Sequence, residues 1–265
     1  MLDERREAVR IQSDAGGGPI VMAFQPVVDI RRGEVFAYEA LARRPGGSSA
    51  VDVFRGVFGC DLARLERRLV LEALKSAAAL GIRTRLAINL GGTMLGDLAE
   101  LESLGEMVVR AGLSADQIIF ELPEHLPIEP SSWKATHQTL RMAGFSTAID
   151  DFGAGHAGLS VLALYSPQLL KLDIGLTRGV SADVPRQVIV SGIVGIASKL
   201  GVEVAAEGVE TLEDAICLSE MGISLQQGYF YGRPTLEELL TPNLMALFRA
   251  YSQTASASAR EVAVE

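Results

Sequence analysis

Short apolar runs alternate with longer amphipathic stretches along most of the chain. The apolar runs are predicted to be strands, and most are continuously apolar, as expected for strands buried on both faces of a parallel sheet. The expected strands are residues 20–30, 35–42, 85–90, 117–122, 145–150, 169–174 and 202–208, with a weaker one at 223–230.

Helical periodicity fills most of the intervals between these runs. The expected helices are residues 61–80, 97–112, 132–144, 184–201 and 211–222. Several end in a glycine followed by the next apolar run, which is typical of a helix C-cap that leads into a strand. Eight strands alternating with helices in 265 residues favour an α/β fold of the TIM-type (β/α)8 barrel class over an open doubly wound sheet.

The start of this barrel is expected to be irregular. Only the four residues RRGE, 31–34, separate the first two strands. That connection is too short for a crossover helix, so the pair should be an antiparallel hairpin. Both ends of the chain are rich in small or polar residues, which predicts a mobile segment at 1–18, a barrel at 19–250 and a loosely packed tail at 251–265.

Polar side chains recur at or near the C-terminal ends of the strands, which converge on one mouth in a barrel. A single carboxylate there is more often a helix cap or a solvated loop residue, and a lone lysine usually extends to water. Independent caps would not favour oxygen ligands on five strands, so we expect one site. The residues are Glu39, Asn89, Glu121, Asp150, Asp151, Lys171, Asp173, Glu207, Gln226 and Gln227.

Several carboxylates at one mouth cannot all stay ionised without compensating charge. Mg²⁺ or Mn²⁺ would supply it through oxygen ligands, whereas zinc is not expected, because no His or Cys is among the candidates. Two such ions about 4 Å apart form a clamp for phosphodiester cleavage. Asp150 is the expected bridging ligand, and Lys171 could orient or deprotonate the attacking water, or neutralise charge in the transition state.

The segment AIDDFGAGHAGL, residues 148–159, also contains the pattern G-x-G-x-x-G of a dinucleotide-binding loop, with Asp173 twenty residues beyond Gly153. In that motif a pyrophosphate rests on the amides at the start of a helix. Asp150 and Asp151 would repel it. The aspartates are therefore expected to hold metal, and the glycines to let the loop bend.

Composition narrows the possible partners. A net charge of −9 argues against binding to a nucleic-acid polymer, although metal ions could still attract an anionic substrate. Cys60 and Cys217 are the only cysteines, which fits a reducing compartment and neither a disulfide framework nor a zinc pattern. The N-terminus lacks the apolar core of a signal peptide, and the most apolar window, 188–197, is too short to span a bilayer. The expectation is a cytoplasmic protein without a membrane span.

Seven blocks, found in order between FQPVVD and QGYFYGRP, resemble the EAL-domain cyclic di-GMP phosphodiesterases. Any one of them is weak, but the ordered set is very specific. The blocks are EALAR, INL, FELPE, DDFGAG, LLKLD, AEGVET and QGY. The resemblance implies a barrel with an antiparallel first strand, hydrolysis of cyclic di-GMP to linear pGpG with two Mg²⁺ or Mn²⁺ ions, inhibition by Ca²⁺, and a homodimer.

The resemblance also implies roles for individual residues. The expected catalytic residues are Lys171, beside the nucleophilic water, and Glu39, Glu207 and Asp151. The expected ligands are Glu39, Asn89, Glu121 and Asp150 for one metal and Asp150, Asp151 and Glu207 for the other, with Asp173 near the second. The expected substrate contacts are Gln25, Leu41, Arg43, Gln227 and Pro234, with Arg43 suited to a phosphate. Glu124 is expected to position the loop after the aspartates.

Departures from the usual family pattern leave every proposed ligand in place. Pro123 replaces a common threonine, Arg44 replaces a frequent tryptophan, and His156 lies in the glycine loop. His156 could make the loop pH-sensitive, although a solvated loop histidine is the simpler explanation. The alternatives to an enzyme are a cyclic di-GMP receptor with little catalysis, and an interaction module with degenerate motifs. No GGDEF motif is visible, and the N-terminal segment is too short for a sensor domain. Two alternatives stay open: a stand-alone enzyme, and the catalytic piece of a longer protein with a sensor domain or regulatory partner.

Overall fold

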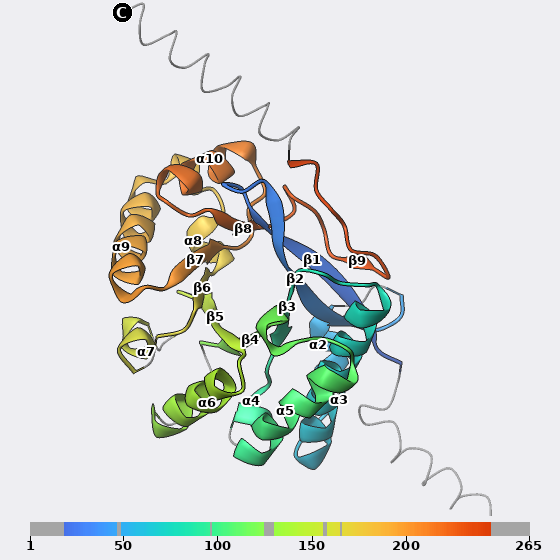
Figure 1. Ribbon diagram of the computed structural model, residues 1–265. Helices are drawn as coiled ribbons and strands as arrows, with labels where there is room; N and C mark the ends of the chain where they lie inside the picture. The colour runs from blue at the N-terminus through green and yellow to red at the C-terminus, as the bar shows by residue number, and fades with distance from the viewer. Residues whose placement is uncertain are drawn as a thin grey trace, which may run out of the picture.

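The computed structural model describes residues 19–46, 49–95, 97–124, 130–155, 158–164 and 166–244. Three expectations concern residues outside these ranges: the mobile segment 1–18, the loosely packed tail 251–265 and the pH-sensitive His156. The described chain folds as one closed barrel of strands surrounded by helices (Figure 1).

Eight strands close the barrel in the order β2-β3-β4-β5-β6-β7-β8-β1, because β1 also pairs with β2. β1 is antiparallel to both neighbours and the remaining pairs are parallel, which confirms the predicted barrel with an antiparallel first strand. A ninth strand extends beside β1. The strands are β1 Val21–Asp29, β2 Glu34–Arg43, β3 Arg85–Asn89, β4 Ile118–Pro123, β5 Ser146–Phe152, β6 Leu169–Leu172, β7 Glu203–Ala206, β8 Leu225–Gln227 and β9 Thr235–Leu236.

The five predicted helices are confirmed to within a few residues. Four short helices, α2, α4, α7 and α8, were not predicted, because a few residues cannot show a helical period. The helices are α2 Ala50–Phe54, α3 Cys60–Ala79, α4 Gly92–Leu95, α5 Leu98–Arg110, α6 Pro130–Met142, α7 Leu159–Leu164, α8 Ile174–Thr177, α9 Val184–Leu200 and α10 Leu212–Glu220, with 3-10 turns η1 Ala115–Gln117 and η2 Val180–Ala182.

Two expected strands are shorter than the sequence indicated. β6 ends at Leu172 because the next residue, Asp173, caps α8 by accepting a hydrogen bond from the amide of Gly175 at 2.7 Å. β8 ends at Gln227 because the carbonyl of Gly228 accepts from the amides of the residues three and four positions later, at 3.0 and 3.1 Å, which turns the chain.

The inside of the barrel is built in two layers. The lower layer is an apolar cluster, and four of its eight members are alanines, which have small side chains. The members are Val27, Ala37, Ala87, Ile119, Ala148, Leu169, Ala205 and Leu225. Side chains alternate along a strand, so the residue two positions nearer the mouth also faces inward. In every strand that residue is polar, and we call the set the polar ring: Gln25, Glu39, Asn89, Glu121, Asp150, Lys171, Glu207 and Gln227.

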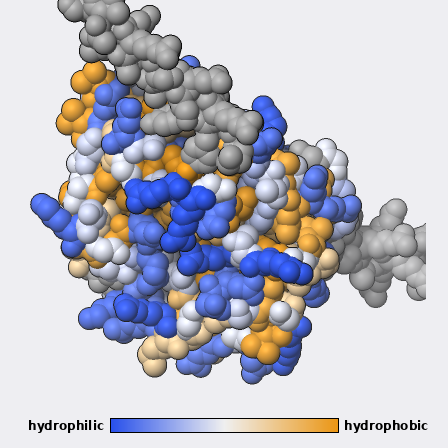
Figure 2. Space-filling model, turned by 45° about the horizontal axis from the view of Figure 1, so that its top comes forward, coloured by the Kyte–Doolittle hydropathy of each residue, from blue (hydrophilic) through white to orange (hydrophobic). Residues whose placement is uncertain are grey.

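The outside of the strands packs against the helices in the main core, which contains most of the large buried side chains. On the surface of the molecule, hydrophilic residues gather across the middle of the face that Figure 2 shows, and hydrophobic residues lie to either side. The fold therefore places an acidic, hydrogen-bonding layer at one end of a barrel whose interior is otherwise lined by an apolar cluster and whose outer face is mainly apolar.

One buried carboxylate outside the barrel fixes the connection that leads into α9. Asp214, on α10, is 2% exposed and accepts from the amides of Gly179 and Ser181, both at 3.0 Å, and from the Ser181 hydroxyl at 2.8 Å. Burial opposes its ionisation, but these hydrogen bonds outweigh burial and hold the pKa of Asp214 below its ordinary value.

Replacement of this carboxylate, Asp214→Asn, is expected to destabilise the protein by roughly 1–3 kcal/mol at pH 7. Because the folded pKa is depressed, the contribution is complete above the unfolded pKa of about 3.9 and disappears as the pH falls through the folded value. Denaturant unfolding at pH 7 and near pH 3 should show the difference between the two proteins shrink. A constant difference, or an equal loss in the exposed control Asp116→Asn, would contradict this.

Candidate metal and phosphodiester site

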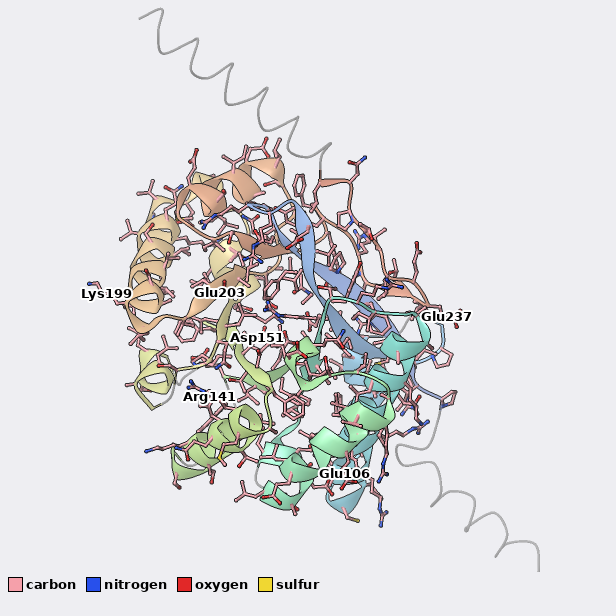
Figure 3. All side chains as sticks on the ribbon, in the orientation of Figure 1. Glu106, Arg141, Asp151, Lys199, Glu203 and Glu237 are labelled. Carbon is pink, nitrogen blue, oxygen red and sulfur yellow. The ribbon has the colours of Figure 1, made fainter. Side chains whose placement is uncertain are left out.

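Six of the eight members of the polar ring line a cavity of about 800 Å³ at the carboxyl ends of the parallel strands, whereas Glu121 and Lys171 are buried and do not line it. Members of the ring and its neighbours that line the cavity are Gln25, Glu39, Leu41, Asn89, Asp150, Asp151, Glu207 and Gln227. In Figure 3, Asp151 lies within the circle of strands, whereas Glu106 and Lys199 lie on peripheral helices. Most of the expected strand-end residues therefore meet at one site. The expectation for Gln226 was wrong: because adjacent residues of a strand face opposite sides, it lies on the other face from Gln227, where its Nε2 atom donates to the carbonyls of Ala215 and Ile223.

Lys171 lies at the centre of the ring and is 1% exposed. Its Nζ is 2.6 Å from Glu207, 2.7 Å from Asp150 and 2.8 Å from Glu121, with Glu39 at 3.4 Å. Burial alone would lower the pKa of the ammonium, but the four carboxylates together raise it well above its ordinary value. These carboxylates hold the lysine as an ammonium group, the form that its expected roles in orientation and charge neutralisation require.

The ring carries more negative charge than this one lysine can balance. Burial raises the pKa of Glu207 to about 8, and it raises the pKa of Glu121 well above its usual range, in both cases against the attraction of Lys171. Burial also raises the pKa of Asp151, with the neighbouring Asp150 adding to the effect. A protein that keeps these groups ionised at neutral pH needs further positive charge at this position.

The donor atoms fit a divalent cation. Within the described residues, Asp150, Asp151 and Glu207 form a group whose carboxylate oxygens can all lie within 4.8 Å of one another. The buried oxygens Oε1 of Glu121 and Oδ1 of Asp150 have Lys171 as an ion-pair partner, at 2.8 and 2.7 Å, and no further hydrogen-bond donor. Hard oxygens in an acidic cluster that share a single ammonium group are suitable ligands for Mg²⁺ or Mn²⁺.

A backbone irregularity lets two consecutive aspartates serve the same site. Adjacent residues of a regular strand face opposite sides of the sheet. Here the pairing of β5 with β6 shifts register between Ile149 and Phe152, and Asp151 adopts a left-handed conformation with φ of 54°. Such a conformation is unfavourable for residues other than glycine, and aspartate tolerates it better than most. As a result, Asp150 and Asp151 both line the cavity.

Amide side chains orient the carboxylates on the opposite side of the ring. The Nδ2 atom of Asn89 donates to Glu39 and to Glu121, both at 3.2 Å. The Nε2 atom of Gln227 donates to Glu39 at 2.6 Å and to Gln25 at 3.2 Å. Residues expected to bind metal and residues expected to bind substrate are thus joined in one hydrogen-bonded network.

The glycine loop after the aspartates does bind an anion, but the anion belongs to the protein. Three amides of the G-x-G-x-x-G pattern donate to the carboxylate of Glu124: Gly153 at 2.9 Å, Gly155 at 3.1 Å and Gly158 at 2.6 Å. Glu124 is 1% exposed. Oriented backbone amides form such a concavity for negative charge. Bending is part of the glycines' role, since Gly153 and Gly158 have φ of 103° and 55°.

Loss of this anchor, in Glu124→Gln, should lower turnover roughly 10–100-fold by weakening metal affinity, the range found for residues behind a metal ligand. The side chain of the new glutamine has only one accepting oxygen, and its NH2 group would face backbone N–H groups, which are themselves donors. Turnover measured against Mn²⁺ concentration tests this, with the exposed Glu106→Gln as the control. Equal behaviour of the two variants would show that the loop does not depend on this carboxylate.

Three of the expected site residues occupy less direct positions. Arg43 and Pro234 are half-buried and are not among the residues that line the cavity, and the Nη1 atom of Arg43 donates to the carbonyl of Ala42 at 2.9 Å. Asp173 caps α8, yet it is close enough to Asp151 to contribute to the rise in the pKa of that residue.

The cavity wall also contains polar residues that were not predicted. Glu66, on α3, is buried, and Arg178 and Glu210 form an ion pair at the rim. Glu66 shares a helix face with Val70 and Ala73, which are buried too. A glutamate at an apolar position of an amphipathic helix is the signal that could have identified it. Arg178 and Glu210 lie on loops and carry no comparable pattern.

The fold and the ring define a class of protein: a TIM-type barrel with a carboxylate-rich site at the mouth formed by its strand ends. The EAL domain family profile matches residues 8–234. The chain belongs to the EAL domain family.

Known proteins resemble the chain both in sequence and in structure. Cyclic di-GMP phosphodiesterase RocR of Pseudomonas aeruginosa is 31% identical over 169 residues, which are 63% of this chain and 43% of RocR. A manganese and cyclic di-GMP complex of Klebsiella pneumoniae BlrP1 superposes with a TM-score of 0.80 at 34% identity, over 85% of this chain and 58% of that one. A standalone EAL protein from Vibrio cholerae, bound to cyclic di-GMP, gives 0.82 at 33% identity, over 85% and 96%.

Three curated relatives are longer than the matched region, since the chain spans 43%, 33% and 32% of their lengths. Within the part of the chain that the structure describes, no helix combines the length and apolar character needed to cross a bilayer.

Proposed function

We propose that the protein hydrolyses one phosphodiester of cyclic di-GMP to give linear pGpG, using two divalent cations. The observation that carries the proposal is the polar ring with the adjacent Asp151: the carboxylates and the amide of the two expected ligand sets are all present, and all of them except the buried Glu121 line one cavity. Relatives named as cyclic di-GMP phosphodiesterases, and structures that contain the dinucleotide, support the choice of substrate. The enzyme would act in the cytoplasm, where a cyclic dinucleotide messenger is found.

The residues present would hold the cations in two overlapping sets. Glu39, Asn89, Glu121 and Asp150 form one, and Asp150, Asp151 and Glu207 form the other, with Asp173 beside the second. When bound, the cations would supply Lewis-acid chemistry, polarising the phosphodiester and lowering the pKa of water. Either Mg²⁺ or Mn²⁺ suits these oxygen donors, and Ca²⁺ is expected to support binding and to inhibit turnover.

The chain's own residues bind and orient the reacting groups. Lys171 places a fixed positive charge beneath the site of attack, in a dry environment where it stabilises a developing negative charge more than it could in water. Gln25, Leu41 and Gln227 line the wall that the dinucleotide would contact. Arg43 is expected to turn from the carbonyl of Ala42 toward a phosphate, to which a guanidinium can donate two parallel hydrogen bonds.

Product analysis tests the proposal directly. Purified protein is incubated with cyclic di-GMP and Mn²⁺, and again with EDTA, and the nucleotides are separated by chromatography. Linear pGpG formed only with Mn²⁺ would support a metal-dependent phosphodiesterase. Tight binding with Ca²⁺ but no product would instead indicate a receptor. The absence of both product and binding would refute both functions.

We also propose that the protein acts as a homodimer joined through α9. The outward face of this helix carries large apolar side chains, including Val188 at 68% and Ile189 at 51% exposure. Gly192 and Gly195 lie on the same helix, and a methyl group added at either would meet open space, so a second copy could approach the backbone closely. A helix with apolar residues on both faces is typically buried on both, which supports a second copy packing on the exposed face of α9.

A charge placed on this face should separate the two subunits. Val188→Asp is expected to shift the protein from dimer to monomer in analytical ultracentrifugation, because the interface would bury an unpaired carboxylate. The matched control is Val109→Asp on α5, where the valine is 72% exposed. A wild-type protein that is already monomeric, or a dimer that survives the substitution at α9, would exclude this interface.

A further inference from the structure

We propose that Glu66 is a positioning residue for the metal site, which holds the loop after Asn89 against the polar ring. The inference rests on the proposed function, and no expectation from the sequence assigned a role to this residue. Glu66 is 7% exposed and lies on α3, outside the barrel. Its Oε2 atom accepts from the amide of Thr93 at 3.0 Å and also from the Thr93 hydroxyl.

A carboxylate at this position is costly unless it has a structural task. Glu66 occupies the buried face of α3 together with Val70, Ala73 and Ala77. Burying a charged group among apolar side chains is unfavourable unless its oxygens are hydrogen-bonded. Thr93 supplies those bonds from the beginning of α4, so the cost of burial is offset only while the loop stays where it is.

Gly91 shows how closely the carboxylate and this loop fit together. The residue does not adopt a left-handed conformation, so the backbone itself does not require glycine. A Cβ atom built on Gly91 would lie 1.9 Å from Cδ of Glu66 and 2.2 and 2.4 Å from its two oxygens. The carboxylate therefore occupies the space that any side chain at position 91 would need, and it could make room only by breaking its bonds to Thr93.

The loop connects this contact to the ring. Leu90 donates from its amide to the carbonyl of Glu121 at 2.9 Å, which ties one side of the loop to β4. Glu66 ties the other side. Asn89, immediately before Leu90, bridges Glu39 and Glu121. Both Glu66 and Gly91 line the same cavity as Asn89.

A comparable arrangement exists on the other side of the site. Glu124 holds the loop after Asp150 and Asp151, and Glu66 holds the loop after Asn89. Each half of the acidic site thus has a buried glutamate that holds the adjacent loop: Glu124 accepts from three backbone amides, and Glu66 accepts from one amide and one hydroxyl. Outer residues of this kind commonly change metal affinity 10–100-fold when they are replaced.

Glu66→Gln is expected to raise the Mn²⁺ concentration for half-maximal turnover about ten-fold, within that range. Turnover at saturating Mn²⁺ should recover to within about two-fold of wild type, and calorimetry should show the same loss of Mn²⁺ affinity without substrate. Glu72→Gln is the matched control, because Glu72 lies on the same helix and pairs with Lys75 at the surface. A purely structural role for Glu66 would lower the unfolding temperature and leave the Mn²⁺ requirement unchanged.

A double-mutant cycle tests the contact itself. Gly91→Ala should lose Mn²⁺ affinity like Glu66→Gln, because the new methyl displaces the carboxylate. In a Glu66→Ala background the methyl has room, so adding Gly91→Ala should cost little more. Additive losses, or a Glu66→Gln variant that behaves like Glu72→Gln while the wild type is active, would overturn this inference alone. A wild-type protein that neither binds Mn²⁺ nor turns over substrate would overturn the proposed function and this inference with it.

Discussion

Replacing Lys171 by methionine is expected to lower turnover by roughly 10²–10⁴-fold while leaving cyclic di-GMP binding in the presence of Ca²⁺ largely intact. Methionine keeps the length of the side chain but removes the one cation at the centre of four carboxylates. The ligand oxygens remain, so cations can still bind. What is lost is the fixed charge beneath the phosphodiester.

The same substitution should have an effect on stability that depends on metal. Removal of one partner from a buried ion pair typically costs roughly 3–5 kcal/mol, because the other charge stays buried without compensation. In EDTA, Lys171→Met should therefore unfold at lower denaturant concentration than wild type, and Mn²⁺ should restore much of the difference. Single-turnover kinetics, calorimetry and unfolding curves together test the prediction, with the exposed Lys75→Met as control. Retained turnover would show that the central charge is not needed.

The second large effect is expected for Asp150→Asn, which should abolish both cation binding and turnover, the latter by at least about 10³-fold, as for the loss of an essential group in other active sites. Asp150 belongs to the acidic group with Asp151 and Glu207, and it shares the ammonium of Lys171 with Glu121, with which it is proposed to hold the other cation. An amide offers one neutral oxygen where a carboxylate offers two charged ones, so both metal positions would be weakened.

Asp173→Asn provides the contrast for this experiment. Asp173 uses one oxygen to cap α8, and asparagine caps helices about as well as aspartate does. We expect a much smaller loss than at Asp150, measured as Mn²⁺ affinity by calorimetry and as turnover. Equal losses at the two positions would mean that Asp173 contributes as much to metal binding as Asp150 does. Full activity of Asp150→Asn would rule out Asp150 as a ligand shared by two cations. Together with Lys171→Met, these variants separate loss of metal from loss of catalysis.

Much of the site follows from the period of two along each strand. Ala148 and Asp150 face the same side of β5, and Ala205 in β7 is likewise followed two positions later by Glu207, directly after that strand. The lower apolar layer and the polar ring therefore both follow from alternating positions of the sequence. The short connection RRGE likewise required an antiparallel hairpin. These features are local, because they depend on backbone geometry over a few residues, and they could be predicted without knowing what lies opposite.

Other features arise only when segments far apart in the chain meet. The sequence predicts that Asp150 and Asp151 lie together, but the register shift against β6 is what turns both toward the cavity. The charge state of Lys171 depends on carboxylates from four other strands. Glu124 and Glu66 find their amide partners about thirty residues away, at separations of 29 and 27.

The sequence by itself therefore determined the barrel, its antiparallel start and many of the strand-end residues at its mouth, because strand periodicity, turn length and helix caps act over short distances. Only the tertiary structure decided the charge balance of the ring, the placement of the loops behind it and the distance of Arg43 from the cavity. Ion pairing and desolvation depend on which groups are brought within a few ångströms, and closure of the barrel is what brings them there.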